Sequence, residues 1–260
     1  MNPISIALLS CVLSLIPTIL WGMLFLYKHE EKKILLIKTY IYGGLMVVPL
    51  VFYRTFFQFS PENMFFGFLP SMLVLFVTIA FLEEFLKHLV TRQVDHNEIQ
   101  SIDDAIEFSI VAALGFAFAE NTFYFIEVYQ SLGKEVFYQT IILRSLFATF
   151  AHSLFSSIYG YYYGKQIFAK QIYEQEIPKR ATGTFKRIAR FIHSINPYKI
   201  FQNEMRLLGL LFASIVHATY NILLEMDFIN FLLPFMCFGL YFIFRMIWSK
   251  KNHIVYKKTP

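Results

Sequence analysis

Polar side chains that could hydrolyse an amide bond are placed within four otherwise apolar stretches of the chain. They are Glu83, Glu84, Lys87 and His88; Glu120 and Asn121; His152; and His217 and Asn221. A glutamate in a low-dielectric pocket can act as a general base on water near neutral pH, because burial favours its protonated form. Imidazole and carboxamide groups can position that water or donate hydrogen bonds to a developing oxyanion. No Gly-x-Ser-x-Gly motif points to a serine nucleophile instead.

Helical spacing would bring several of these side chains onto common faces. Residues four apart share one face of a helix. The pairs with this spacing are Glu83 with Lys87, Glu84 with His88, and His217 with Asn221. Glu83 and Glu84 are about 100° apart around a helix axis. We therefore expect one glutamate to face a cavity and the other to be held by a partner.

Each polar side chain also fits a structural role when it is taken alone. Glu83 and Lys87 could form a buried ion pair. His152 could be an interhelical hydrogen-bond donor, and Glu120 could bond to Tyr124. A charged group in the middle of a membrane span costs about 2.5–3.5 kcal/mol, so several are tolerable only if they face one another or a wet cavity. Their concentration in four stretches therefore favours a shared functional site.

The elements that would position these groups are membrane-spanning helices. Hydrophobic residues make up 57% of the 260 and charged residues 16%, against about 25% charged in soluble domains. Stretches of about 20 apolar residues, enough for a helix to cross a bilayer, recur at 3–27, 34–53, 64–90, 104–130, 136–168, 203–225 and 228–248. They lack the alternation typical of barrel strands. The sequence predicts an all-α fold: a polytopic transmembrane helix bundle of about seven spans, with residues 1–260 in one membrane domain.

The basic residues predict how this bundle is oriented. They gather at 28–33, 169–202 and 250–258, which lie on one side if there are seven spans. By the positive-inside rule the N-terminus is outside and the C-terminus is cytoplasmic. The net charge of +5 is then a topology signal and does not indicate a nucleic-acid partner.

The loop 169–202 contains GTFKRIARFIHSI, which predicts a basic amphipathic helix. Such a helix could lie at the cytoplasmic interface and contact anionic headgroups. Simple retention of positive charge inside the cell explains the same residues equally well. Separately, Gly160 and Gly164 form a small-xxx-small pair that would let two helices approach closely, and Gly115 could do the same.

Four of these segments, in order, resemble the motifs of the PrsW-type intramembrane proteases. They are EEFLK at 83–87, GFAFAENTFY at 115–124, His152 with Gly160, and HATYN at 217–221. The resemblance covers roughly residues 70–225, the expected catalytic core. A more distant similarity links the paired glutamates and the His-x-x-x-Asn segment to the CAAX prenyl endopeptidases.

The resemblance implies a role for each matched residue. Glu83 would activate water with assistance from Glu84, His152 and His217 would position that water, and Asn221 would help bind the oxyanion. Lys87, Glu120 and Asn121 would support them. The implied activity is bacterial intramembrane cleavage of a membrane-anchored protein such as an anti-sigma factor.

Metal dependence is a separate expectation. The resemblance favours a glutamate mechanism without cofactor or metal, and the sequence has no His-Glu-x-x-His helix. The alternative is zinc held by Glu83, Glu84, His152 and His217, since open catalytic zinc sites use such ligands.

Other functions remain compatible with the sequence. A prenyl-protein or peptide-pheromone endopeptidase would use the same residues. A proton-coupled transporter would also need carboxylates and histidines across a bundle, although no inverted repeat is visible. A membrane scaffold without catalytic activity is the remaining alternative.

Overall fold

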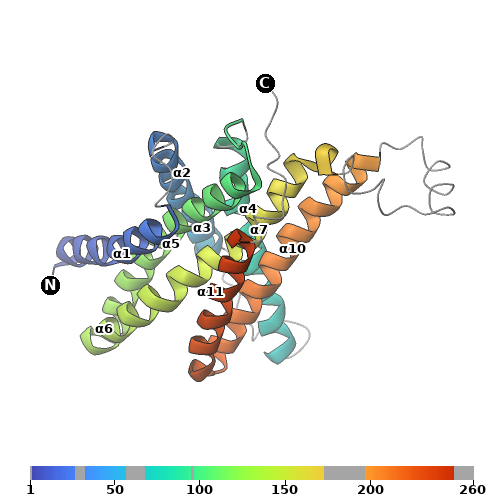
Figure 1. Ribbon diagram of the computed structural model, residues 1–260. Coiled ribbons are helices and arrows are strands. Elements are labelled where there is room, and N and C mark those ends of the chain that lie inside the picture. Colours follow the sequence, from blue (N-terminus) through green and yellow to red (C-terminus); the bar gives the residue numbers. More distant parts are fainter. Residues whose placement is uncertain (1, 27–32, 57–67, 95–96, 173–196, 249–260) are drawn as a thin grey trace.

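The computed structural model describes residues 2–26, 33–56, 68–94, 97–172 and 197–248, and every regular element in these ranges is helical (Figure 1). The elements are α1 Pro3–Leu26, α2 Lys33–Leu45, α3 Val47–Phe56, α4 Phe68–Val94, α5 Ile102–Leu132, α6 Lys134–Leu143, the π-helix η2 Arg144–Ala148, α7 Thr149–Ile167, α10 Pro197–Glu225, the 3₁₀-helix η3 Ile229–Phe231 and α11 Leu232–Trp248. The predicted all-α membrane bundle is therefore confirmed.

The helices follow the seven apolar stretches of the sequence. Three stretches are each built from consecutive helices: α2 continues into α3, α6 runs through η2 into α7, and η3 leads directly into α11. Within the described parts of the chain, four segments are long and apolar enough to cross a bilayer: Pro3–Met23, Lys33–Phe52, Lys134–Ile167 and Lys199–Glu225. A shorter apolar segment follows at Ile229–Arg245. The number of spans stays a prediction, as does the orientation of the termini.

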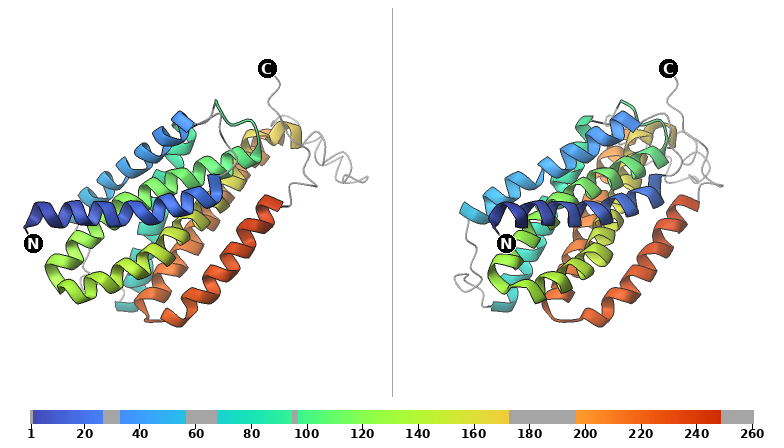
Figure 2. Two further views of the ribbon diagram at one scale, coloured as in Figure 1. Left: turned by 60° about the vertical axis from the view of Figure 1, so that its left-hand side comes forward. Right: turned by 90° about the vertical axis from the view of Figure 1, so that its left-hand side faces the viewer.

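Helix α5 is the centre of the bundle. It packs against α1, α2, α4, α6 and α7, while α10 packs against α4 and α7 (Figure 2). Much of α5 is buried by these neighbours, including Phe108, Phe116 and Phe125. The outer helices instead expose apolar side chains such as Leu8 and Phe238, as expected of a surface in contact with lipid. The arrangement places the polar residues of α5 in the interior.

Glycines let α5 approach its neighbours closely. A Cβ atom on Gly160 of α7 would lie 2.7 Å from the backbone oxygen of Ala105, and one on Gly164 would lie 2.9 Å from the Cα of Ile102. The predicted role of this small-xxx-small pair is confirmed. Gly115 of α5 lies in the same way against the backbone of Tyr40 in α2.

The expected basic amphipathic helix at 185–195 lies outside the described residues, as do most residues of the loop 169–202. The structure therefore does not test this prediction, nor the division of the chain into a catalytic core at 70–225 and its surroundings.

Candidate active site

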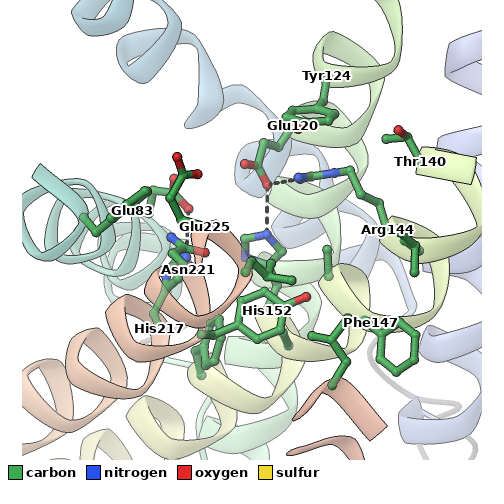
Figure 3. Close-up of a pocket in the computed structure, with 18 of the residues that line it drawn as sticks. Glu83, Glu120, Tyr124, Thr140, Arg144, Phe147, His152, His217, Asn221 and Glu225 are labelled. Atoms are coloured by element: carbon green, nitrogen blue, oxygen red, sulfur yellow. Dashed lines mark hydrogen bonds and ion pairs between the residues drawn. The ribbon is translucent and has the colours of Figure 1, made fainter. Parts of the chain in front are cut away.

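Helices α4, α5, α7 and α10 bring their polar side chains together at one cavity (Figure 3). The cavity has a volume of about 400 Å³. Among its lining residues are Glu83, Glu120, His152, His217 and Asn221. The four stretches that we expected to converge therefore do so, although they are separated by up to about 130 residues in the chain.

The two adjacent glutamates are held differently. Glu84 is buried, and its Oε1 accepts hydrogen bonds from Lys87 Nζ at 2.8 Å and from His217 Nδ1 at 2.9 Å. Glu83 lines the cavity, and its Oε2 lies 3.6 Å from His217 Nε2 and 3.9 Å from Lys87 Nζ. One glutamate faces the cavity and the other is held by partners, as the helical spacing predicts.

The partners of His217 determine which ring nitrogen carries a proton. A carboxylate only accepts hydrogen bonds, so Nδ1 of His217 donates to Glu84 Oε1. Nε2 then faces Glu83. The ring is stacked on Phe155 at a centroid distance of 4.5 Å and lies 5.5 Å from the His152 ring. Glu84 thus orients His217 toward Glu83, as carboxylates commonly orient functional histidines.

Lys87 links α4 to His152 of α7. Its Nζ lies 2.8 Å from His152 Nδ1. Because an ammonium group only donates, Nδ1 is the acceptor and Nε2 of His152 carries the proton. That Nε2 donates to Glu120 Oε2 at 2.9 Å. Lys87 also lies 4.4 Å from the centre of the Phe116 ring. The ion pair of Glu83 and Lys87 is therefore the weaker part of a network that joins four helices, since Glu84 also bonds to His217 of α10.

Arg144 is a member of the site that our sequence analysis missed. Its Nη2 lies 3.0 Å from Glu120 Oε2, its Nε donates to Asn121 Oδ1 at 2.7 Å, and its guanidinium covers the Tyr124 ring at 4.2 Å. An arginine inside the apolar stretch 136–168 was a signal that could have found it, because such charges are costly in lipid. Glu120 therefore pairs with Arg144 and His152.

The π-helix η2 begins at Arg144. Single π-turns inside α-helices often occur at functional sites. Here Thr149 Oγ1 donates to the backbone oxygen of Arg144 at 3.1 Å and accepts a hydrogen bond from Asn121 Nδ2 at 3.1 Å. Asn121 is fully buried, and it is absent from the residues that line the cavity. It joins α5 to this turn, which is a supporting position.

Two other residues from the sequence analysis occupy distinct places. Asn221 lines the cavity one helical turn after His217, as its spacing predicts (Figure 3). His88 does not join the site: its Nε2 lies 2.7 Å from the Tyr159 hydroxyl, and its ring packs against Tyr159 and Tyr163. The spacing of Glu84 and His88 thus reflects their position on one helix and no shared function.

The donor groups fit a divalent metal as well as a metal-free site. One ligand atom each from Glu83, His152 and His217 lies within 4.8 Å of the others, and all three side chains are buried. Two histidines and a carboxylate are a known ligand set for catalytic zinc. Glu84, the fourth residue of the expected zinc set, is not among these three donors, and its Oε1 accepts hydrogen bonds from His217 and Lys87.

Comparison with known proteins finds a matching family model and several relatives that share one name. A family model described as "PrsW family intramembrane metalloprotease" matches residues 31–248. The chain is 33% identical over 139 residues to "Protease PrsW" of Shouchella clausii, 34% over 142 residues to that of Oceanobacillus iheyensis, and 34% over 146 residues to that of Geobacillus kaustophilus.

These alignments cover 52%, 53% and 55% of this chain, and 58%, 59% and 58% of the respective relatives. The chain therefore matches less than two thirds of each relative's length. No solved structure matches the chain significantly. The family model extends over most of the chain and includes every residue of the site, from Glu83 to Asn221, and the chain belongs to the PrsW family.

Proposed function

We propose that the chain is an intramembrane endopeptidase that hydrolyses a peptide bond in a membrane-anchored protein. The observation that carries this proposal is the meeting of Glu83, His152 and His217 at one cavity inside a bundle of apolar helices. A carboxylate and two imidazoles, from three separate helices, could hold and activate one water molecule there. Membership of the PrsW family supports the same activity.

In the metal-free form of the reaction, Glu83 takes a proton from water as the oxygen attacks the carbonyl carbon of the substrate. The carbonyl oxygen gains negative charge in the tetrahedral intermediate. The amide of Asn221 lines the same cavity and would donate to that oxygen. The proton held by Glu83 then passes to the leaving amine as the C–N bond breaks. Glu84, Lys87 and Glu120 keep the two histidines in place.

A zinc-dependent form is the second candidate, and the donor group Glu83, His152 and His217 favours it together with the family description. Zinc bound there would supply a Lewis acid that lowers the pKa of a bound water. In this form Glu84 would orient His217, and Glu120 would orient His152 through its Nε2. Lys87 would have to withdraw from His152 Nδ1 if that nitrogen became a ligand.

Metal content and activity distinguish the two forms. Purified protein is dialysed against a chelator, and its zinc is measured by mass spectrometry before and after dialysis. The metal-free form predicts less than one zinc per ten chains and undiminished cleavage. The zinc form predicts about one zinc per chain, which His217→Ala would remove, and cleavage that only added zinc restores.

The position of the cavity suggests which part of a substrate is cut. The cavity extends from Glu83 toward Glu225 and Ile229, at the junction of α10 and α11. This end of α10 is opposite its start at Pro197, which follows the basic loop. If the basic segments are cytoplasmic, the cavity opens to the outer side of the membrane. We propose an outer or juxtamembrane segment of an anti-sigma-like protein as the substrate.

The central experiment is cleavage of a single-span substrate by purified protein in detergent, compared with the Glu83→Gln variant. The variant is nearly isosteric, so we expect its melting temperature to stay within a few degrees while cleavage falls at least 1,000-fold, as for other catalytic groups removed from an active site. Cleavage at the normal rate by Glu83→Gln would reject the assignment. Proton flux in liposomes without proteolysis would favour a transporter instead.

A further inference from the structure

A second cavity adjoins the first and shares Glu83 with it. Its volume is about 410 Å³, and helices α3, α4 and α5 enclose it. Glu83, Glu120 and Tyr124 line both cavities. The acidic side chain proposed to activate water thus borders two spaces, and a bound peptide could extend into each.

The lining of the second cavity is mainly apolar. We call it the apolar chamber and define it by its six apolar side chains, Val47, Leu50, Val51, Phe116, Phe123 and Ile126. The first cavity contains both histidines, Arg144 and Asn221. The two spaces therefore differ in chemistry, and the apolar chamber has a volume typical of ligand pockets, which run from about 300 to 1,000 Å³.

Helix α3 forms one wall of the apolar chamber. Val47 and Leu50 are buried on this wall, at 2% and 8% exposure, and Val51 is half-buried beside them. Val48 and Phe52 point away, at 44% and 59% exposure. The same short helix thus offers a chamber-facing valine and an outward-facing valine, which makes a matched pair of sites for substitution.

The charged residues that line the apolar chamber are glutamates, two of which also face a cation outside the lining: Glu120 pairs with Arg144 at 3.0 Å and Glu83 lies 3.9 Å from Lys87. Glu83 and Glu120 lie at its inner end, and Glu127, an exposed residue, also lines it. Among the described residues that line this chamber there is no lysine, arginine or histidine. An acidic side chain entering the chamber would lose hydration and approach like charges, both of which are unfavourable.

We propose that the apolar chamber is the specificity pocket of the protease. It takes one large apolar side chain of the substrate, such as Leu or Phe, next to the bond that is cut, and it rejects Asp and Glu. This inference rests on the proposed function. The reason is that Glu83 lines both cavities. If the cut bond lies beside Glu83, one flanking residue falls in the apolar chamber and the other in the first cavity.

The first test compares two variants of α3 that each replace a valine with phenylalanine. Val51→Phe fills the chamber, and Val48→Phe adds the same bulk on the outward face. The probe is a single-span synthetic peptide whose cut bond has been mapped, prepared with Leu, Ala or Asp at each flanking position. Filling or emptying an apolar pocket by a few carbon atoms changes selectivity by about 10- to 200-fold.

We expect wild-type protein to cut the Leu peptide at least tenfold faster in kcat/KM than the Asp peptide at one flanking position. Val51→Phe should lower kcat/KM for the Leu peptide about tenfold or more relative to the Ala peptide. Val48→Phe should behave as wild type. Equal Leu-to-Ala ratios in Val51→Phe and Val48→Phe would overturn the proposal.

The second test measures binding without cleavage. The same peptide carries a photoreactive benzophenone at successive positions of its span, and the Glu83→Gln protein is irradiated with it. We expect crosslinks from the position beside the cut bond to residues 47–51 or 116–126. Crosslinks only elsewhere would reject the chamber even if the protein is a protease. Crosslinks to the chamber, together with no cleavage of any tested peptide by the wild-type protein, would instead reject the proposed activity and keep the binding site.

Discussion

Replacing Lys87 with methionine tests whether the polar network is an interdependent unit. The ammonium group is buried, with 2% of the residue exposed. It lies 2.8 Å from Glu84 Oε1, 2.8 Å from His152 Nδ1 and 3.9 Å from Glu83 Oε2. Methionine keeps an apolar side chain of similar length, so the change removes mainly the charge, its hydrogen bonds and its contact with the Phe116 ring.

The expected loss follows from the carboxylate left behind. Breaking a buried ion pair by removing one partner costs about 3–5 kcal/mol, because the other charge stays buried without compensation. The double variant Glu84→Gln/Lys87→Met removes both charges. We therefore expect it to be more stable than Lys87→Met alone, with a coupling energy of about 2 kcal/mol, within the range measured for residues in one network.

The assay is unfolding by SDS in mixed detergent micelles, followed by circular dichroism, for wild type, both single variants and the double variant. Lys38→Met is the control, because Lys38 is exposed on α2 and such changes are usually within about 0.5 kcal/mol. Losses in the single variants that add to within about 0.5 kcal/mol in the double variant would refute the network. So would a loss for Lys87→Met no greater than that for Lys38→Met.

Two further substitutions test how the site is held in position. In Arg144→Gln, Glu120 loses its guanidinium partner. We expect kcat to fall about 10- to 100-fold, as for other changes to groups that orient a ligand. KM and the melting temperature should change little. Arg144→Lys should restore only part of the rate, since lysine lacks the fork that contacts Glu120 and Asn121 together; full recovery would contradict this role. In Gly160→Val the added side chain meets the α5 backbone. We therefore expect overpacking to lower the free energy of unfolding by about 1–3 kcal/mol, measured by the same SDS unfolding. An unchanged unfolding curve would be inconsistent with the close approach of α5 and α7.

Much of the site could be predicted because polar groups are rare inside apolar helices. Glu83, Glu120, His152 and His217 stand out in the sequence for this reason, and their insertion cost requires them to meet. Arg144 carried the same signal and was overlooked. The direction in which Asn121 faces could not be predicted, since an amide on the same helix as Glu120 can face either the cavity or a neighbouring turn.

The sequence by itself determined that the protein lies in a lipid bilayer, that it is helical, and which four segments supply polar groups. Apolar length and backbone satisfaction in lipid decide these properties locally, without reference to partners. Only the tertiary structure decided that Glu84 holds His217 while Glu83 faces the cavity, that Lys87 reaches His152, and that a second, apolar cavity adjoins Glu83. These features depend on the relative rotation and depth of separate helices. Packing between helices, such as the close approach of α7 to α5 at Gly160, fixes that rotation and depth. The spacing of residues along one helix does not encode them.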